Sequence, residues 1–194
     1  MIISKNRSNS STNYNDWIVY HHTNATANDE KFLLNTTAAV ESTNEWGDAD
    51  PTSTVYSVHT SGDGATNDGT DTHLSYVWTG IQGFSKFGSY EGNGNADGTF
   101  VYTGFRPAFV MCKSVDSTSS WHMFDNKREG YNVDNDALVA EDTTAEATTD
   151  MIDLLSNCFK CRITTDPNVA ETYIYMAFAE APFVNSNGVP CNAR

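Results

Sequence analysis

Asp63, Asp68 and Asp71 are the residues of this chain whose type and spacing come nearest to metal chemistry. They share one Gly-rich stretch, and carboxylate oxygens are the ligands that Ca²⁺ takes in proteins. Asp134 and Asp136 form a similar pair in another loop. Neither group fits the spacing of an EF-hand, and carboxylates in turns are commonly just solvated. The sequence therefore predicts no cofactor, with Ca²⁺ as the one ion for which it offers ligands.

Ring-stacking on sugars is the second chemistry that the residue types allow. Three aromatic residues lie beside Gly, Asn or Asp in turn-like surroundings, where an exposed ring could cover a sugar face and amide or carboxylate groups could bind its hydroxyls. Packing inside the domain is the alternative for each ring. The predicted ligand contacts are Trp46, Tyr90, Asn93, Asn95, Asp97 and Tyr131.

Catalytic motifs are not found in the sequence. It contains no H-E-x-x-H, no G-x-S-x-G and no P-loop, and its carboxylates do not single out a glycosidase pair. The chain is therefore predicted not to be an enzyme, and no catalytic residue is nominated. The histidines occur singly or as one adjacent pair, without a spaced Cys partner: His21, His22, His59, His73 and His122.

The four cysteines include one C-x-x-C, Cys158 and Cys161, without a second pair to complete a zinc site. On an extended strand, residues three apart point to opposite faces, so these two thiols would chelate only from a turn. We expect Cys112, Cys158, Cys161 and Cys191 to be unpaired thiols, mostly in the core.

Short runs of aromatic and β-branched residues must position these groups. From Gly104 to Phe183 such runs alternate with clusters of Asn, Asp, Thr and Gly, which is typical of short strands joined by turns. The chain has 10 Phe, 4 Trp and 9 Tyr, too many aromatic residues for a disordered segment. At 194 residues it is long enough for one sandwich or barrel domain. We predict an all-β, jelly-roll-like sandwich of the concanavalin or lectin type.

Charge excludes several partners. The net charge is −14 with 11 Lys and Arg, so no basic stripe is available to neutralise the phosphates of nucleic acid or of an anionic membrane. No segment approaches the 18 or so apolar residues that span a bilayer, and the N-terminus lacks a basic region followed by an apolar run. The sequence thus predicts neither nucleic-acid binding nor membrane insertion, and no visible export signal.

The chain also contains a degenerate duplication. Trp17 and Leu34 are 17 residues apart, as are Trp121 and Leu138. Residues 72–78 align with 172–178, residues 54–58 with 150–154, and residues 1–5 with 110–113. We therefore predict one domain over 1–194, made of a first repeat over about 1–78, a connector hairpin over about 79–103, a second repeat over about 104–183 and a tail over 184–194.

The order of motifs in the second half resembles a domain of unknown function found in tail-fibre and other structural proteins of bacteriophages, especially marine ones. The connector, with Gly83-Phe84-Ser85-Lys86-Phe87-Gly88 and Asp97-Gly98, is similar to the same family. The resemblance covers nearly the whole chain. Its motifs are Gly104-Phe105-Arg106-Pro107, Trp121, Phe124-Asp125, Leu138, Ala145-Glu146, Ser156-Asn157-Cys158-Phe159 and Tyr173-Ile174-Tyr175-Met176-Ala177-Phe178-Ala179-Glu180.

The resemblance implies a place on the surface of a virion and contacts with other virion proteins. The leading expectation is a tail-fibre or receptor-binding adhesin that recognises a host surface glycan, as a homotrimer by analogy with other phage fibres. A head-decoration or tail-surface subunit without a ligand is the alternative, and a glycan depolymerase is the third. Because the chain is acidic, adhesion to an anionic glycan is expected to need a divalent cation.

Overall fold

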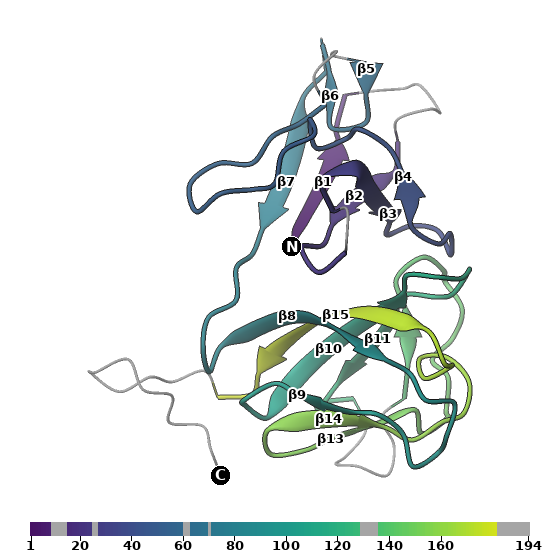
Figure 1. Ribbon diagram of the computed structural model, residues 1–194. Helices are drawn as coiled ribbons and strands as arrows, with labels where there is room; N and C mark the ends of the chain where they lie inside the picture. The colour runs from purple at the N-terminus through teal and green to yellow at the C-terminus, as the bar shows by residue number, and fades with distance from the viewer. Residues whose placement is uncertain (9–14, 25–26, 60–62, 70, 129–135, 182–194) are drawn as a thin grey trace. The chain divides into compact units, whose positions relative to one another are not determined.

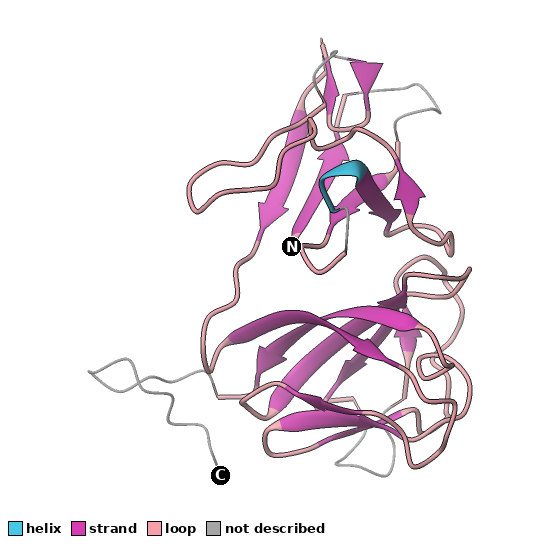
Figure 2. Ribbon diagram, in the orientation of Figure 1, coloured by secondary structure: helices cyan, strands magenta, loops and turns pink. Residues whose placement is uncertain are grey.

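The computed structural model describes residues 1–194 except 9–14, 25–26, 60–62, 70, 129–135 and 182–194. Strands and loops make up these residues, and the one helical turn among them is η1 (Ala27–Asp29) (Figure 2). All strand pairs are antiparallel, which confirms the predicted all-β, sandwich-like class. The described part contains no helix of the length and apolarity needed to cross a membrane.

The chain forms two compact units, Met1–Trp78 and Thr79–Arg194. The first has the bounds predicted for the first repeat, whereas the predicted connector and second repeat together form the second. The sequence predicted these parts as one domain, but each unit has its own sheets and its own buried cluster.

The first unit is built on a five-stranded sheet (Figure 1). Its strands lie in the order β4 (Glu41–Ser42), β3 (Glu30–Leu33), β2 (Trp17–Tyr20), β1 (Ile2–Asn6) and β7 (His73–Val77). A separate short hairpin pairs β5 (Asp63–Gly64) with β6 (Asn67–Asp68).

Alternation along β1 and β2 sends every second side chain into the core of the first unit. Ile2, Ile18 and Tyr20 form this face, and Trp46 packs on it from a loop. The Trp46 ring meets the Tyr20 ring edge-on with 5.5 Å between centroids, and its Nε1–H donates to the backbone oxygen of Glu30 at 3.0 Å. The indole therefore buries its large apolar area while its polar group stays bonded.

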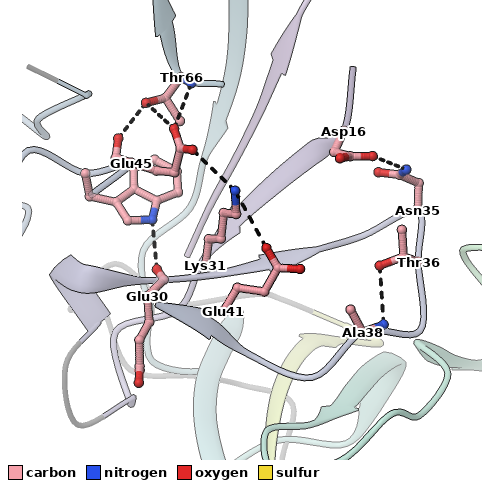
Figure 3. A network of polar contacts seen from close by, with 10 residues as sticks. Asp16, Glu30, Lys31, Asn35, Thr36, Ala38, Glu41, Glu45 and Thr66 are labelled. Atoms are coloured by element: carbon pink, nitrogen blue, oxygen red, sulfur yellow. Dashed lines mark hydrogen bonds and ion pairs between the residues drawn. The ribbon is translucent and has the colours of Figure 1, made fainter. Parts of the chain in front are cut away.

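A polar network holds the loop around Trp46 (Figure 3). The buried carboxylate of Glu45 accepts from the backbone N–H of Thr66 at 3.2 Å and from Nζ of Lys31 at 3.3 Å. Lys31 also lies 3.7 Å from the carboxylate of Glu41. A buried carboxylate is tolerated only when donors and a counter-charge replace water, and here all of them come from the same unit.

The second unit consists of two layers, with the three-stranded sheet below the five-stranded one in Figure 1. The larger sheet has the order β12 (Leu138–Val139), β11 (His122–Asp125), β10 (Pro107–Ser114), β15 (Thr172–Ala179) and β8 (Ser85–Glu91). The smaller has the order β13 (Ile152–Leu154), β14 (Cys158–Cys161) and β9 (Phe100–Tyr102).

Side chains from both sheets meet in one apolar cluster. Tyr90 lies at its centre, stacked on Tyr173 with 5.1 Å between ring centroids and edge-on to Phe159 at 5.6 Å. Its hydroxyl donates to the backbone oxygen of Pro167 at 2.8 Å. The other members include Val101, Phe105, Val110, Cys112, Phe124, Ile152, Leu154, Cys161, Tyr175 and Ala177.

The two five-stranded sheets share four strands in the same spatial order, β3-β2-β1-β7 in the first unit and β12-β11-β10-β15 in the second. Their registers also agree. Ser4 pairs with Ile18 and Ser75, and its counterpart Cys112 pairs with His122 and Tyr175. The sequence repeat predicts the same correspondences, because it aligns Lys5 with Lys113, Trp17 with Trp121 and Thr72 with Thr172. The two halves are therefore related in structure as well as in sequence.

Three details of the predicted repeat are wrong. The match between β3 and β12 is displaced by two residues from the predicted alignment. Leu33 lies opposite Ile18 in the first unit, whereas Val139, two positions later than the alignment predicts, lies opposite His122 in the second. Residues 54–58 form no strand, since local bonds such as Val55 N–H to the Thr52 hydroxyl at 3.1 Å satisfy the backbone there. The connector is not a hairpin: its two strands, β8 and β9, pair with β15 and β14 in different sheets.

The cysteines follow the prediction where they are described. Cys112, Cys158 and Cys161 are buried free thiols, and Cys191 lies outside the described residues. Burial raises the pKa of Cys158 to about 11 and that of Cys161 to about 12. Both thiols therefore stay protonated at neutral pH, the inert state of core cysteines.

Candidate functional site

Two exposed aromatic rings stand on β9, the edge strand of the three-stranded sheet. Phe100 is 55% exposed and Tyr102 is 57% exposed, whereas Val101 between them is buried in the core. The period of two along a strand explains this pattern, because Phe100 and Tyr102 share the outer face and Val101 takes the inner one. Large exposed rings side by side are unusual on a protein surface and are characteristic of binding sites.

Two lysines flank these rings. Nζ of Lys86, on β8, donates to the backbone oxygen of Tyr102 at 2.6 Å and lies 5.1 Å from the centre of the Tyr102 ring. Lys160 lies directly opposite Phe100 on β14 and forms an ion pair with Asp97. The ammonium of Lys160 holds the pKa of Asp97 below its ordinary value, first through their hydrogen bond and then through charge. Asp97 is thus a carboxylate at neutral pH.

The loop between β8 and β9 brings three polar side chains to the same surface. Asn93, Asn95 and Asp97 are all exposed in it. Asn93 Nδ2 donates to the backbone oxygen of Asp97 at 3.2 Å, and the backbone N–H groups of Asn95 and Asp97 donate to the side-chain oxygens of Asn93 and Asn95. These successive Asx turns give the loop a defined course.

Asn168 anchors this loop from below. Its side chain is fully buried, and its Nδ2 donates to Oδ1 of Asn93 at 3.0 Å, to the backbone oxygen of Asn95 at 2.8 Å and to that of Ile163 at 2.7 Å. Its Oδ1 accepts from the backbone N–H of Asn93 at 3.2 Å. One side chain therefore replaces water for several backbone groups of the loop.

Close backbone contacts hold both ends of the loop. A Cβ added at Gly92 would lie 1.9 Å from the backbone oxygen of Val169, and one added at Gly98 would lie 2.4 Å from that of Cys161. Only glycine permits these approaches. The loop is consequently fixed on the sandwich, which reduces the ordering entropy that a ligand would otherwise have to overcome.

These residues form one continuous surface, which we call the β9 strip. Contacts between neighbours connect it, from Asn93 to Asp97, from Asp97 to Lys160, from Lys160 to Phe100 and from Tyr102 to Lys86. It offers apolar ring faces beside amide, carboxylate and ammonium groups. Its members are Lys86, Asn93, Asn95, Asp97, Phe100, Tyr102 and Lys160.

A family model described as a domain of unknown function, DUF7483, matches residues 1–182. The chain belongs to this family. The DUF7483 match spans the described part of both units, including the β9 strip. No curated protein and no solved structure matches the chain.

The predicted ligand contacts of this DUF7483 chain divide into three groups. Asn93, Asn95 and Asp97 come together in the β9 strip. Trp46 and Tyr90 do not: they are 1% and 7% exposed and belong to the cores of different units, so the prediction that their rings face a ligand is wrong. Both rings are buried because a large aromatic side chain fills the centre of each cluster. Tyr131 lies outside the described residues.

The sequence reasoning missed Phe100, Tyr102, Lys86 and Lys160. The pattern Phe-Val-Tyr directly after a Gly-rich turn indicates that the two rings share one face of a strand, but it does not decide whether that face is turned outward. The lysines carry no such signal, because they reach the strip from β8 and β14 by strand pairing far apart in the sequence.

The three predicted calcium ligands do not form a described cluster. Asp68 lies opposite Asp63 in the β5–β6 hairpin, and the side chain of Asp63 is outside the described part. Oδ2 of Asp71 accepts from Nδ2 of Asn6 at 2.8 Å. Among the side chains that the structure describes, no three of His, Cys, Asp and Glu converge as metal ligands. The Ca²⁺ site therefore stays a prediction.

A second group of aromatic residues lies on the sheet of the first unit. Trp17 and Tyr76 stack with 6.5 Å between ring centroids, and Tyr76 and Trp78 stack at 5.9 Å. Nζ of Lys5 lies 5.9 Å from the Trp17 ring. The corresponding residue of the second unit, Trp121, is fully buried, whereas Trp17 is half-buried.

Proposed function

We propose that this DUF7483 chain is a glycan-binding adhesin domain displayed on the surface of a phage particle, as part of a tail fibre or receptor-binding protein. The observation that carries the binding function is the β9 strip, with two exposed rings beside a fixed polar loop. The resemblance of the motifs to phage structural proteins supports the setting.

The strip matches the chemistry of a sugar. The C–H faces of a pyranose ring are apolar and pack on aromatic rings such as Phe100 and Tyr102, and its hydroxyls exchange hydrogen bonds with amides, carboxylates and ammonium groups. Asn93, Asn95 and Asp97 supply such groups next to the rings, and the loop that carries them is fixed before binding.

The charge of the strip bears on the kind of glycan. Lys86 and Lys160 contribute two positive charges against the one carboxylate of Asp97, although the whole chain carries −14. An anionic glycan would be attracted locally and repelled by the rest of the surface. We therefore propose that binding to anionic host glycans depends on Ca²⁺ or Mg²⁺, and binding that is unchanged in excess chelator contradicts this part of the proposal.

Binding is favoured over hydrolysis by the composition of the strip. Glycoside hydrolysis commonly uses two carboxylates flanking the scissile bond, whereas the β9 strip contains only Asp97, which is ion-paired to Lys160. A depolymerase would release new reducing ends from host glycan, and their appearance on incubation with the pure protein would restore the enzymatic alternative.

The deciding experiment measures binding of the labelled protein to candidate host cells before and after their surface glycans are removed. Saturable binding that is lost with the glycans is the expected result. Phe100→Ala and Tyr102→Ala should each weaken it about tenfold, the effect of losing about 1.4 kcal/mol of ring contact. Val55→Ala is the control, because it removes an exposed apolar side chain outside both the β9 strip and β7.

Two results would overturn the proposal. Binding that survives glycan removal would mean that the receptor is not a glycan. Loss of binding in Tyr76→Ala with none in Tyr102→Ala would move the site to the stacked rings of the first unit.

A structural subunit without a ligand is the second candidate. The exposed apolar side chains Leu74, Tyr76 and Val77 on β7 favour it, because an assembly protein has to offer such residues to its neighbours. A correctly folded protein that binds no host cell would support this candidate.

A further inference from the structure

Strand β7 ends the five-stranded sheet of the first unit, and the described residues place no strand beyond it. Trp78 N–H donates to the backbone oxygen of Met1, which shows that even-numbered residues of β7 bond to β1. Because bonding direction alternates along an antiparallel strand, His73, Ser75 and Val77 point their N–H and C=O groups away from the sheet. This edge can accept another strand.

In the second unit the corresponding edge is paired with a further strand. Strand β15 corresponds to β7 and pairs with β10 on one side, as β7 pairs with β1. On its other side β15 pairs with β8 over its whole length. The residues of β15 that correspond to His73, Ser75 and Val77 each have a partner on β8: Tyr173 lies opposite Tyr90, Tyr175 opposite Gly88 and Ala177 opposite Lys86. Among the described residues of the first unit, no strand takes the place of β8 beside β7.

The side chains of β7 do not protect this edge. Natural edge strands usually carry Lys, Pro, an inward-pointing charge or a bulge that blocks pairing with another chain. Strand β7 reads His-Leu-Ser-Tyr-Val, without a charged residue or a proline, and its register with β1 is continuous. Leu74, Tyr76 and Val77 are exposed on it.

We propose that β7 pairs antiparallel with β7 of a second copy of this chain, about a two-fold axis at Ser75. The two five-stranded sheets then continue into each other. In this register Leu74 lies opposite Tyr76 of the second copy on one face, and His73 lies opposite Val77 of the second copy on the other. All three exposed apolar side chains of the strand are covered by a single contact, which is why a second copy fits this edge.

The net charge of the chain and the small area of the contact predict how strong this dimer is and how it responds to salt. The chain carries −14, so two copies repel each other over most of their surface, and an uncharged strand is where they can approach. The symmetric register places no like charges opposite each other within β7. The contact involves five residues per copy, which is small beside the roughly 800 Å² per partner of a standard interface. The dimer should therefore be weak and should form more readily at high salt.

Sedimentation equilibrium over about 1 to about 500 µM protein tests the proposal, because a small interface corresponds to a micromolar dissociation constant. We expect the mass to rise from one chain to two over this range, and the midpoint to move to lower concentration in high salt. Val77→Lys should raise the dissociation constant at least about tenfold, since a lysine on the edge opposes strand addition. Val55→Lys is the control, because it makes the same change at a valine of similar exposure outside β7. It should leave the dissociation constant unchanged.

Ser75→Pro provides a second variant. The N–H of Ser75 points away from β1, so proline removes a backbone bond of the proposed dimer and no backbone bond within the unit. Within the unit it removes the bond that the Ser75 hydroxyl donates to the hydroxyl of Ser4 at 3.0 Å. Circular dichroism and thermal unfolding establish that the variant is folded. Three outcomes overturn the proposal: a single-chain mass at every concentration, a trimer, or a dimer that persists in both Val77→Lys and Ser75→Pro.

Discussion

Single positions in the two units can be compared directly because their registers agree. Ile18 and His122 occupy the same place on β2 and β11, opposite Ser4 and Cys112. Ile18 is buried in the apolar cluster of its unit. His122 is also buried, its ring stacks on Phe124, and both ring nitrogens lack a hydrogen-bond partner in the described part. The second unit thus bears the cost of an unsatisfied polar ring that the first avoids.

His122→Ile should therefore stabilise the protein by about 1 to 3 kcal/mol, the usual penalty of a buried unsatisfied polar group. The reciprocal change Ile18→His should destabilise it by a similar amount. Chemical denaturation of the three proteins measures both effects. If His122→Ile is destabilising, the ring has a favourable role that its contacts do not reveal.

The pH dependence of the difference in unfolding free energy between the wild-type protein and His122→Ile gives an independent check on the role of this histidine. Burial lowers the pKa of His122 below 6.5, so the unfolded chain binds a proton that the folded chain does not. The stability of the wild-type protein should consequently fall as the pH drops below about 6.5 by an amount that His122→Ile does not show. If the unfolding free energies of the two proteins change with pH in the same way, proton uptake by His122 on unfolding is excluded as a contribution to stability.

At the scale of elements, the loop between β8 and β9 depends on one buried side chain outside it. Asn168→Ala removes the amide that binds Asn93 and the backbone of Asn95, and leaves several loop groups unpaired. We expect a loss of about 2 to 4 kcal/mol in unfolding free energy and weaker glycan binding, because the polar half of the β9 strip loses its anchor. Asn157→Ala changes an exposed asparagine of the same unit and is the control. Proteolysis within residues 92–99 of the variant would report the freed loop.

The strands were largely predictable from the sequence, whereas the pairing of strands and the site were predictable only in part. The aromatic and β-branched runs between Gly104 and Phe183 predicted short strands there, and β11 and β15 lie within two of these runs, because strand formation depends on local composition. The partners of β8 and β9 were not predictable, because a Gly-rich turn is compatible with a hairpin and with a crossing between sheets. Strands β8 and β9 both lie at the edge of a sheet, so whether Tyr90 or Tyr102 faces solvent depends on which face of its strand is turned towards the other sheet, and that is decided only when the sheets assemble.

At the scale of the whole molecule, the two units have separate sheets and separate buried clusters. Residues 79–194 expressed alone should therefore fold, with a β-type circular dichroism spectrum and a cooperative thermal transition. They should also retain glycan binding, since all members of the β9 strip belong to this unit, but should lose concentration-dependent dimerisation because β7 is missing. An unfolded fragment would mean that the first unit is required for the second to be stable.

Both units pair a central strand with the strand that comes last in the unit. Strand β1 lies beside β7, with Met1 bonded to Trp78, and β10 lies beside β15. Neither sheet can close until distant parts of the chain meet, so much of the chain entropy is lost before these contacts form. The molecule should refold slowly, on the millisecond-to-second timescale of non-local β proteins, and stopped-flow fluorescence of its tryptophans can time this step. During that interval β10 lacks the neighbour β15 that later covers one of its edges, which makes dilute conditions the best choice for producing the protein.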